Sequence, residues 1–395
     1  MVSRILALQV SPGEVWAALV AEGKLIALNL AREGVADAVG AVFLGRVVAL
    51  RPDLPAALID VGLDRPGFLD ARDADTQRGI AGLTEGAAVM VEILKAARLD
   101  KAAGLRLLRA GDPRCDAYAA AAGSATPPAR LDRAEPAIVA AAKPLLPAGE
   151  ILVDERGALA ELKRTFPETA SAMCFHGDAT PLFESLGIAD QVEAALQPRV
   201  ALPGGGALFI EATQAAAMID VDGGVQGALA ANLAAACVVA RQIRLRNLAG
   251  PIVIDFVGMR KREERDKVAA RLKAACVAEE LGVELLGWTK LGHFELVRAR
   301  RSPALAEILC ERGADGVWRK TALTIALAVL RDVAREAAAQ PGKSFALAAH
   351  PDIVAVLDRG AGLAAREWLE TRLGRKLAIE ADPRRAREAV DIRAR

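Results

Sequence analysis

The sequence predicts an α/β protein of several domains, and three observations support this class. Residues 205–300 alternate strand and helix patterns, which is typical of an α/β layer. Residues 38–108 contain five short strand patterns with glycine-bearing turns between them, which predicts a small β-barrel. The chain has 395 residues, 53% of them hydrophobic. That length allows roughly two to four domains with buried cores.

The first half of the chain is predicted to be rich in short strands. Three apolar runs separated by Pro-Gly and Glu-Gly turns predict a meander, over residues 3–9, 14–20 and 23–29. After the barrel, residues 111–149 are rich in Ala, Pro and Gly, with one helix pattern near 134–143. This stretch is either a linker or a reduced subdomain. Residues 150–200 then alternate short strand and helix patterns.

The second half shows clearer periodicity. The segments GALFIEA and AAAMIDVD predict a hairpin, and a helix follows over about 228–247. The buried strand PIVIDFV, a charged helix over about 261–281 and the strands VELLGW and HFELVRA complete the α/β layer. Beyond residue 302 we expect helices near 303–310 and 320–337, and then a small α+β tail.

Composition excludes several classes of protein. Lys plus Arg number 51 and Asp plus Glu number 50, so a globally basic nucleic-acid coat is excluded, although a local basic face is not. The five cysteines form no CxxC pair, which suits a reducing compartment and argues against a disulfide framework. No run resembles a targeting segment, and the longest apolar stretches are shorter than a membrane span of about 20 residues. We therefore expect a cytoplasmic protein without a membrane span.

Three acidic residues form the best candidate site. Asp220 and Asp222 lie two residues apart at the end of one predicted strand, so they share a face. Asp255 ends the strand that follows the next helix, and such a crossover places both strand ends at one edge of the sheet. Carboxylates at neighbouring strand ends suit Mg²⁺ or Mn²⁺, although strand-end aspartates also serve as caps and turn residues. His293 precedes the strand that faces this edge.

Basic residues cluster around the same edge and indicate contact with phosphate groups. Residues 260–273 carry seven cations among three acidic residues. The charges at 263–267 are equally typical of a solvated helix face with i,i+4 pairs. The other candidates end the preceding helix or follow the last strand, and they are Arg241, Arg244, Arg246, Arg298, Arg300 and Arg301.

The predicted barrel also offers contacts for nucleic acid. Barrels of this kind stack bases on exposed aromatic side chains and bind the backbone with cations. Phe68, Lys101 and Arg46 are the candidates. The alternative for Phe68 is a place in the barrel core.

Several blocks of the sequence resemble one known family. VFLGRVVALRPDLPAALIDVGLDRPGFLDA is similar to the S1 domain of the RNase E/RNase G endoribonucleases. FIEATQAAAMIDVDGG, ARQIRLRNLAGPIVIDFVGM and WTKLGHFELVRARRSP resemble that family's catalytic hairpin, the helix and strand with its second aspartate, and the following strand. The order of the blocks holds over roughly residues 1–108 and 150–395.

The resemblance implies a composite fold. An RNase H-like domain carries an inserted S1 (OB-type) barrel, and a DNase I-like catalytic domain and a small α+β C-terminal domain follow. The expected boundaries are 1–37 and 150–200 for the two RNase H-like parts, 38–108 for the S1 barrel, 109–149 for a degenerate sensor region or linker, 201–305 for the DNase I-like domain and 306–395 for the C-terminal domain.

The resemblance also implies an activity. The family cleaves single-stranded RNA with Mg²⁺ and leaves 5′-phosphate and 3′-hydroxyl ends. By motif position Asp220 and Asp255 become the metal ligands, and Asp222 stands where the family usually has Asn. Phe68 and Lys101 match S1 residues that contact RNA. Single-stranded RNA is thus the expected partner, and a homodimer is compatible with the family.

The chain also departs from the family pattern. The segment DVDGGVQGALAANL passes directly into the helix, so a basic loop is shortened, and Leu58 replaces an S1 aromatic residue. The Arg-Thr pair that senses a 5′-monophosphate has no clear counterpart in 109–149. The family's zinc link is reduced to Cys310-Glu-Arg-Gly, and because a tetrahedral site needs four ligands we expect no zinc.

These matches to the family pattern and departures from it leave three candidate functions. The intact Asp220 and Asp255 favour a metal-dependent endoribonuclease, whose activity the departures could weaken. The shortened loop, the missing sensor and Leu58 favour an RNA-binding protein of the same fold with little or no turnover. A protein-interaction scaffold is the third, but it would not need the acidic pair.

Overall fold

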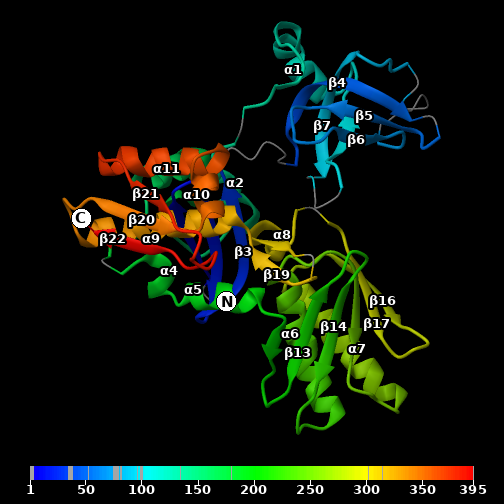
Figure 1. The fold of residues 1–395 in the computed structure, drawn as a ribbon. Helices are drawn as coiled ribbons and strands as arrows, with labels where there is room; N and C mark the ends of the chain where they lie inside the picture. The colour runs from blue at the N-terminus through cyan, green and yellow to red at the C-terminus, as the bar shows by residue number, and fades with distance from the viewer. Residues whose placement is uncertain are drawn as a thin grey trace. The chain divides into compact units, whose positions relative to one another are not determined.

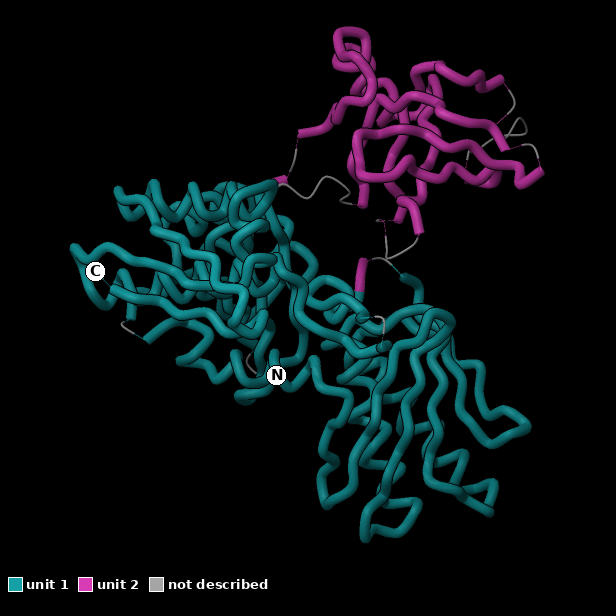
Figure 2. The backbone as a smooth tube through the Cα atoms, viewed as in Figure 1, with its two compact units in different colours: residues 1–33, 136–300, 304–395 teal, residues 34–135, 301–303 magenta. Residues whose placement is uncertain are grey.

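The computed structural model shows a mixed α/β protein with two compact units (Figures 1 and 2). Unit 1 comprises residues 1–33, 136–300 and 304–395, and unit 2 comprises residues 34–135 and 301–303. The structure describes residues 4–33, 39–51, 53–73, 80, 82–95, 97, 101–133, 135–178, 180–300, 302–313 and 315–394. Each unit has its own core and is described separately.

The first sheet of unit 1 has the strand order β11-β10-β1-β2-β3. Strands β1, β2 and β3 form the antiparallel meander that the sequence predicts, while β10 and β11 extend the sheet in parallel to β1. Apolar side chains pack on both faces, with Leu8 and Leu162 in one cluster and Trp16 and Ile188 in the other. The strands are β1 (Arg4–Ser11), β2 (Glu14–Ala21), β3 (Lys24–Arg32), β10 (Glu150–Val153) and β11 (Met173–Phe175); the flanking helices are α2 (Ala137–Ala142), α3 (Arg156–Thr165), α4 (Leu182–Ser185) and α5 (Ile188–Leu196).

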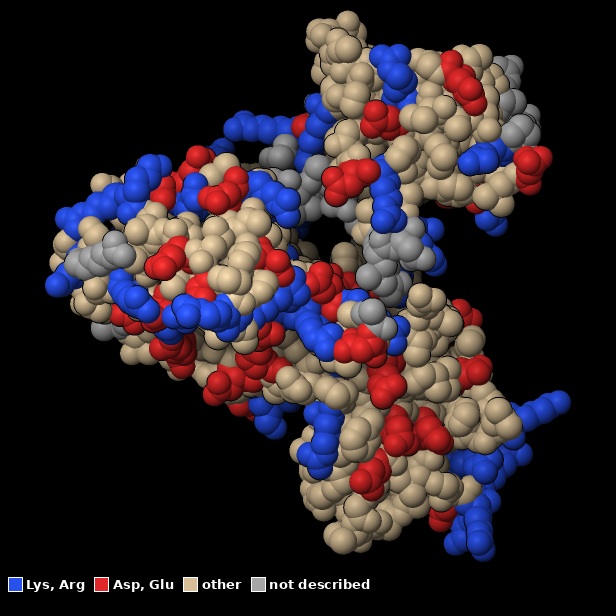
Figure 3. All heavy atoms as spheres, in the orientation of Figure 1, with Lys and Arg blue, Asp and Glu red and all other residues tan. Residues whose placement is uncertain are grey.

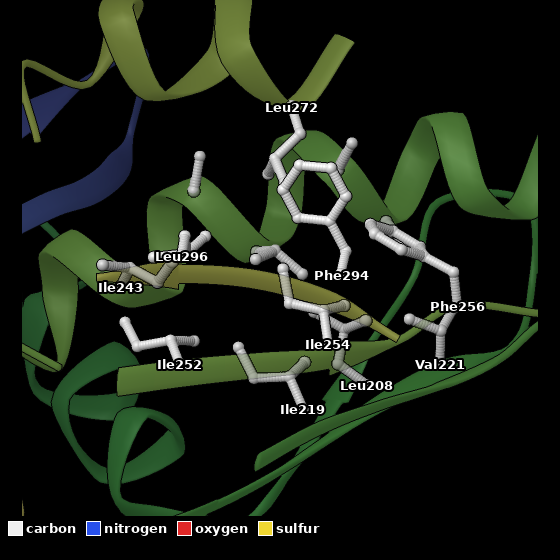
Figure 4. Packing of buried hydrophobic residues seen from close by; sticks show 14 of the residues in the cluster. Leu208, Ile219, Val221, Ile243, Ile252, Ile254, Phe256, Leu272, Phe294 and Leu296 are labelled. Atoms are coloured by element: carbon white, nitrogen blue, oxygen red, sulfur yellow. The ribbon is translucent and has the colours of Figure 1, made fainter. Parts of the chain in front are cut away.

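The second sheet of unit 1 has the order β12-β13-β14-β15-β17-β16. The predicted hairpin, helix, strand, helix and two strands all form in this order. Side chains of the two helices and of the sheet share one core, in which Ile243 and Leu272 pack with Ile254 and Leu296 (Figure 4). The elements are β12 (Arg199–Ala201), β13 (Ala207–Ala212), β14 (Ala217–Asp222), α6 (Ala228–Leu245), β15 (Gly250–Asp255), α7 (Arg262–Ala278), β16 (Val283–Trp288) and β17 (Phe294–Arg298).

Helix α6 is long and apolar enough, by length and composition alone, to cross a membrane. Half of this segment is buried inside the protein, and Ala235, Val239 and Ile243 are fully buried. Its apolar character therefore follows from its place as the core helix of the second sheet.

The opposite face of this sheet carries exposed side chains. In β14 the side chains alternate strictly, with Ile219 and Val221 buried and Met218 and Asp220 exposed. Phe209 on β13 is also exposed, and it is the register partner of Asp220. Strand periodicity thus separates the core from an open face that holds the acidic residues.

The C-terminal part of unit 1 is the α+β tail that the sequence predicts. Its sheet has the order β21-β20-β22, and helix side chains such as Leu330 and Leu369 pack with Leu347 in its core. A short hairpin precedes it. The elements are α8 (Leu305–Leu309), β18 (Cys310–Arg312), β19 (Trp318–Lys320), α9 (Ala322–Ala339), β20 (Phe345–Ala349), α10 (Pro351–Leu357), α11 (Gly360–Leu373), β21 (Ala378–Ala381) and β22 (Asp391–Ala394).

Unit 2 is a small closed β-barrel, as the sequence predicts. Strand β4 pairs with both β5 and β7, which closes the order β4-β5-β6-β8-β7. Ile59, Leu69, Ile93 and Leu105 are fully buried in its interior. The elements are β4 (Val42–Arg51), β5 (Ala56–Asp60), β6 (Gly67–Asp70), β7 (Ala88–Lys95), β8 (Gly104–Leu107), α1 (Pro113–Ser124) and β9 (Ala129–Arg130).

Helix α1 lies in a segment whose composition indicates a linker or a reduced subdomain. Asp112 caps it by accepting a hydrogen bond from Arg114 N at 2.8 Å, and Pro113 occupies the first turn. Arg114 also pairs with Glu92 of the barrel. Capping and an ion pair explain why an Ala-rich stretch without buried residues is helical here.

Candidate active site and RNA-contact surfaces

Two aspartates meet at the carboxyl ends of adjacent parallel strands. Asp220 of β14 and Asp255 of β15 are direct register partners, and both side chains are exposed. Parallel neighbours lie about 4.8 Å apart in a sheet. The expected adjacency of these residues is therefore confirmed.

The local sequence explains why both carboxylates reach the open face. Ile219 and Ile254 precede the two aspartates and point into the core beneath the helices (Figure 4). The strand alternation then turns Asp220 and Asp255 to the other side.

A buried asparagine fixes the chain beyond Asp255. Asn232 of α6 is fully buried, its Nδ2 donates to Val257 O at 2.7 Å, and Val257 N donates to its Oδ1 at 3.0 Å. The nitrogen and the oxygen of the side-chain amide thus both bind one backbone residue, which lies two positions after Asp255. Sequence reasoning missed Asn232, although a lone amide in the alanine-rich run ALAANLAAAC was the available signal.

The turn after β14 is held by contacts with the turn between β12 and β13. Gln226 Nε2 donates to Pro203 O at 3.2 Å and to Gly205 O at 2.8 Å. Gly206 has a φ of +85°, and a Cβ there would lie 2.2 Å from Asp222 O. Glycine is therefore required where the two turns cross.

Asp222 takes part in this turn. Its Oδ1 accepts a hydrogen bond from Gly224 N at 2.9 Å. Among the residues that the structure describes, no group of three His, Cys, Asp or Glu side chains is placed to hold a metal ion. Asp220 and Asp255 are thus brought together, whereas Asp222 does not complete a triad with them.

His293 lies next to the acidic pair. Its Nε2 is 3.8 Å from Asp255 Oδ2, and it immediately precedes β17, the antiparallel neighbour of β15. Mg²⁺ is commonly held by one or two carboxylates while it keeps several waters. The exposed pair Asp220 and Asp255 fits that requirement.

Most of the arginines proposed from sequence bind main-chain groups of unit 1. Arg244 donates to Glu279 O at 3.0 Å, Arg298 to Leu248 O at 3.0 Å, and Arg300 to Ala249 O at 2.8 Å. Arg241 similarly donates to Leu25 O. These contacts support the fold and reduce the donors that these side chains can offer to RNA. Arg246 is buried, and Arg301 lies outside the described residues.

Other cations at the acidic edge are exposed. Arg260, Lys261 and Arg262 follow β15, and Lys290 lies in the turn before His293. On the view in Figure 3, acidic side chains gather over the sheet of this part of unit 1, and basic side chains project at its end. Sequence reasoning missed Lys290, which its position in the turn WTKLGH could have indicated.

The barrel presents a second candidate surface. Phe68 is partly exposed and alternates with the buried Leu69, so it lies outside the barrel core. Lys101 and Arg46 are exposed, and Arg46 also donates to Gly86 O at 2.9 Å. Leu58 is the register partner of Phe68.

An additional lysine lies on the same register row as Phe68, with one strand between them in the barrel sheet. Gly104 is the register partner of both Phe68 and Lys95, and a Cβ at Gly104 would lie 3.2 Å from Lys95 Cβ. Because Gly104 has no side chain, the side chain of Lys95 has room to lie over this position of β8. Sequence reasoning did not find Lys95, because a β-bulge shifts the register between Ile93 and Lys95.

Basic residues of the 109–149 segment are partly used in ion pairs. Arg114 pairs with Glu92, and Arg130 Nε lies 3.0 Å from Asp132 Oδ1. Arg109 and Lys143 also have interactions. The absence of a 5′-monophosphate sensor stays a prediction.

Comparison with known proteins gives a consistent result. The family model "Ribonuclease E/G family" matches residues 120–301. Ribonuclease G of Haemophilus influenzae is 23% identical over 98% of both chains, and that of Escherichia coli K12 is 25% identical over 98% of this chain and 99% of its own. Ribonuclease E of Escherichia coli K12 is 26% identical over 82% of this chain and 40% of its own. The alignments with ribonuclease G extend over 483 positions against 395 residues here, so they contain gaps in this chain.

Proposed function

The chain belongs to the ribonuclease E/G family, and from this premise we propose that it is a metal-dependent endoribonuclease acting on single-stranded RNA. The proposed products carry 5′-phosphate and 3′-hydroxyl ends, in RNA processing or decay. The observation that carries the proposal is the register pairing of Asp220 with Asp255 on an exposed face.

Asp220 and Asp255 are the proposed ligands of a Mg²⁺ or Mn²⁺ ion, with Asp222 adding a third negative charge nearby. When bound, such an ion supplies an activated water and neutralises charge on the phosphodiester. His293 orients the carboxylate of Asp255 through their close approach. Asn232 keeps Asp255 in place by holding Val257.

The exposed cations near this pair are the proposed contacts of the RNA backbone. Arg260, Lys261, Arg262 and Lys290 are exposed at the same end of the sheet as Asp255. Lysine and arginine bind phosphate groups without reading sequence. In the barrel, Phe68, Lys101, Arg46 and the additional Lys95 form the second proposed contact surface.

The expected domain boundaries are retained as part of the proposal. The mixed five-stranded sheet supports an RNase H-like domain from residues 1–37 and 150–200. The closed barrel supports an S1 domain at 38–108, and the second sheet with α6 and α7 supports a DNase I-like domain at 201–305. Residues 109–149 are proposed as a degenerate sensor region or linker, and 306–395 as the C-terminal domain.

The direct test is incubation of the purified protein with an end-labelled, A/U-rich single-stranded RNA. Cleavage should occur with Mg²⁺ and stop with EDTA, and the downstream product should carry a 5′-phosphate. Binding without cleavage under any divalent ion would overturn the enzyme proposal. That result would favour an RNA-binding protein of the same fold.

A further inference from the structure

A cavity of about 640 Å³ lies in unit 1, at the other end of the second sheet from the acidic pair. It is lined by the end of β13, which includes Ala212. Ala212 pairs with Ala217, the first residue of β14, whereas Asp222 is the last residue of that strand. Residues of α5, α8 and the β18–β19 hairpin complete the walls. Its volume falls within the range of about 300–1,000 Å³ that small-molecule sites have.

Arg246 is the unusual member of this wall. Its side chain follows α6 and is 7% exposed. Nε donates to Gln242 Oε1 at 2.7 Å, whereas Nη2 is buried and has no hydrogen-bond partner among the described residues. Burial lowers the pKa of the guanidinium to about 10, so the side chain still carries its charge at neutral pH.

Several neighbouring charges of the cavity pair with each other or with residues outside it. Lys320 Nζ lies 2.7 Å from Glu193 Oε1, and Arg319 pairs with Asp315. Glu307 approaches Arg300 at 3.5 Å and also accepts from Ala304 N. Within the part of the chain that the structure describes, no carboxylate pairs with Arg246. Glu211, Arg312 and Glu388 also line the cavity.

A buried, unpaired cation costs free energy unless something compensates it. A planar guanidinium is suited to bind the oxygens of a phosphate or carboxylate group. Trp318 lines the same cavity and offers an aromatic surface to the body of a ligand.

We propose that this cavity binds a small molecule through a phosphate or carboxylate group that contacts Arg246. The site is separate from the proposed nuclease centre and does not depend on it. RNA cleavage at Asp220 and Asp255 would remain possible without a ligand there.

The test is calorimetric titration of the full chain with inorganic phosphate and, separately, with acetate. At least one of these anions should bind, and Arg246→Met should weaken that binding at least tenfold, which equals about 1.4 kcal/mol. The anion that binds identifies the preferred group. The binding anion should also raise the unfolding temperature of the parent protein and not that of Arg246→Met.

Two further variants keep the test decisive. Arg241→Met removes another internal arginine of α6, one that donates to Leu25 O, and it should leave anion binding unchanged. Ala306→Phe places a large side chain in the cavity while it keeps Arg246, and it should weaken binding even where Arg246→Met does not fold. Failure of both anions to bind the parent protein at millimolar concentration, or equal binding by Arg246→Met, would overturn the proposal.

Discussion

At the scale of single residues, the candidate site depends on main-chain register. Asp220 and Asp255 are neighbours because β14 and β15 pair in parallel, and the side chains need no contact with each other. The buried side chains Ile219 and Ile254 set which face the aspartates occupy. Asn232 then fixes the segment beyond Asp255 with two hydrogen bonds to Val257.

Asn232→Ala is expected to weaken both stability and cleavage. Removing the amide leaves the N–H and C=O of Val257 without their partner, at a cost of about 1–3 kcal/mol in the free energy of unfolding. Urea denaturation and cleavage rates measure the two effects. Asn29→Ala is the matched control, because Asn29 of β3 in the first sheet donates to Ala140 O and Ala141 O of α2. It should cost stability but leave cleavage by the folded protein unchanged, and equal loss of cleavage in both variants would contradict the role of Asn232.

At the scale of elements, a partly buried carboxylate joins β10 to β1. Asp154 follows β10, and its Oδ1 accepts from Val10 N at 2.8 Å. Burial raises the pKa of Asp154 from 3.8 to about 6. The folded state therefore binds more protons than the unfolded state between these values, and stability falls as pH rises through this window.

Asp154→Asn tests this linkage. The neutral amide should remove the loss, so the variant should match the parent protein near pH 3.5 and exceed it at pH 7 by about 2–3 kcal/mol. Denaturation midpoints across pH 3.5–7 measure the difference between the two proteins. A difference that does not change with pH would show that Asp154 is not the titrating group.

The outer face of the barrel is the second element with a testable role. Lys95 lies across Gly104 from Phe68, and Lys101 is exposed in the segment before β8. If both lysines contact phosphates, each alanine variant should weaken RNA binding. Each should also reduce the slope of log K against log salt concentration by about 0.7.

Binding to a labelled single-stranded RNA at several salt concentrations provides these slopes. Lys24→Ala is the control, because Lys24 is also exposed but lies in the β2–β3 hairpin of unit 1. Identical slopes for all three variants and the parent protein would remove the barrel lysines from the RNA surface.

At the scale of the whole molecule, sequence patterns predicted the sheets better than the side-chain contacts. The order and type of elements from β13 to β17 followed from periodicity, and so did the meeting of Asp220 with Asp255. The partners of Arg244, Arg298 and Arg300 could not be predicted, because the sequence does not show which main-chain carbonyl an arginine side chain binds. Arginines that cluster in the sequence therefore resembled a phosphate surface.

Two other features needed tertiary information. Lys95 and Phe68 share the register row of Gly104 on the strand between them, and neither the β-bulge nor this glycine is visible in an apolar pattern. Helix α1 depends on the pairing of Arg114 with Glu92, 22 residues earlier in the chain. Local composition indicated only a linker or a reduced subdomain at that place.

The 5′ end of the RNA offers a test of the segment 109–149. Arg114 and Arg130 of this segment are paired with carboxylates, and no Arg-Thr pair is present in its sequence. Cleavage or binding is therefore expected to be nearly indifferent to a 5′-monophosphate or a 5′-hydroxyl. Rates on two RNAs that differ only in this group decide the matter, and a preference of tenfold or more, about 1.4 kcal/mol, would reveal a working sensor.

The central claim is that Asp220 and Asp255 form the metal-dependent nuclease centre. Its most direct test is the rate of Mg²⁺-dependent RNA cleavage by Asp220→Asn and Asp255→Asn, measured beside RNA affinity. Glu211→Gln is the matched control, since Glu211 is an exposed carboxylate of β13 on the same sheet. Each Asp variant should lose at least about 100-fold in rate, roughly 2.7 kcal/mol, with RNA affinity largely kept. Cleavage at the parental rate in both Asp variants would contradict the assignment.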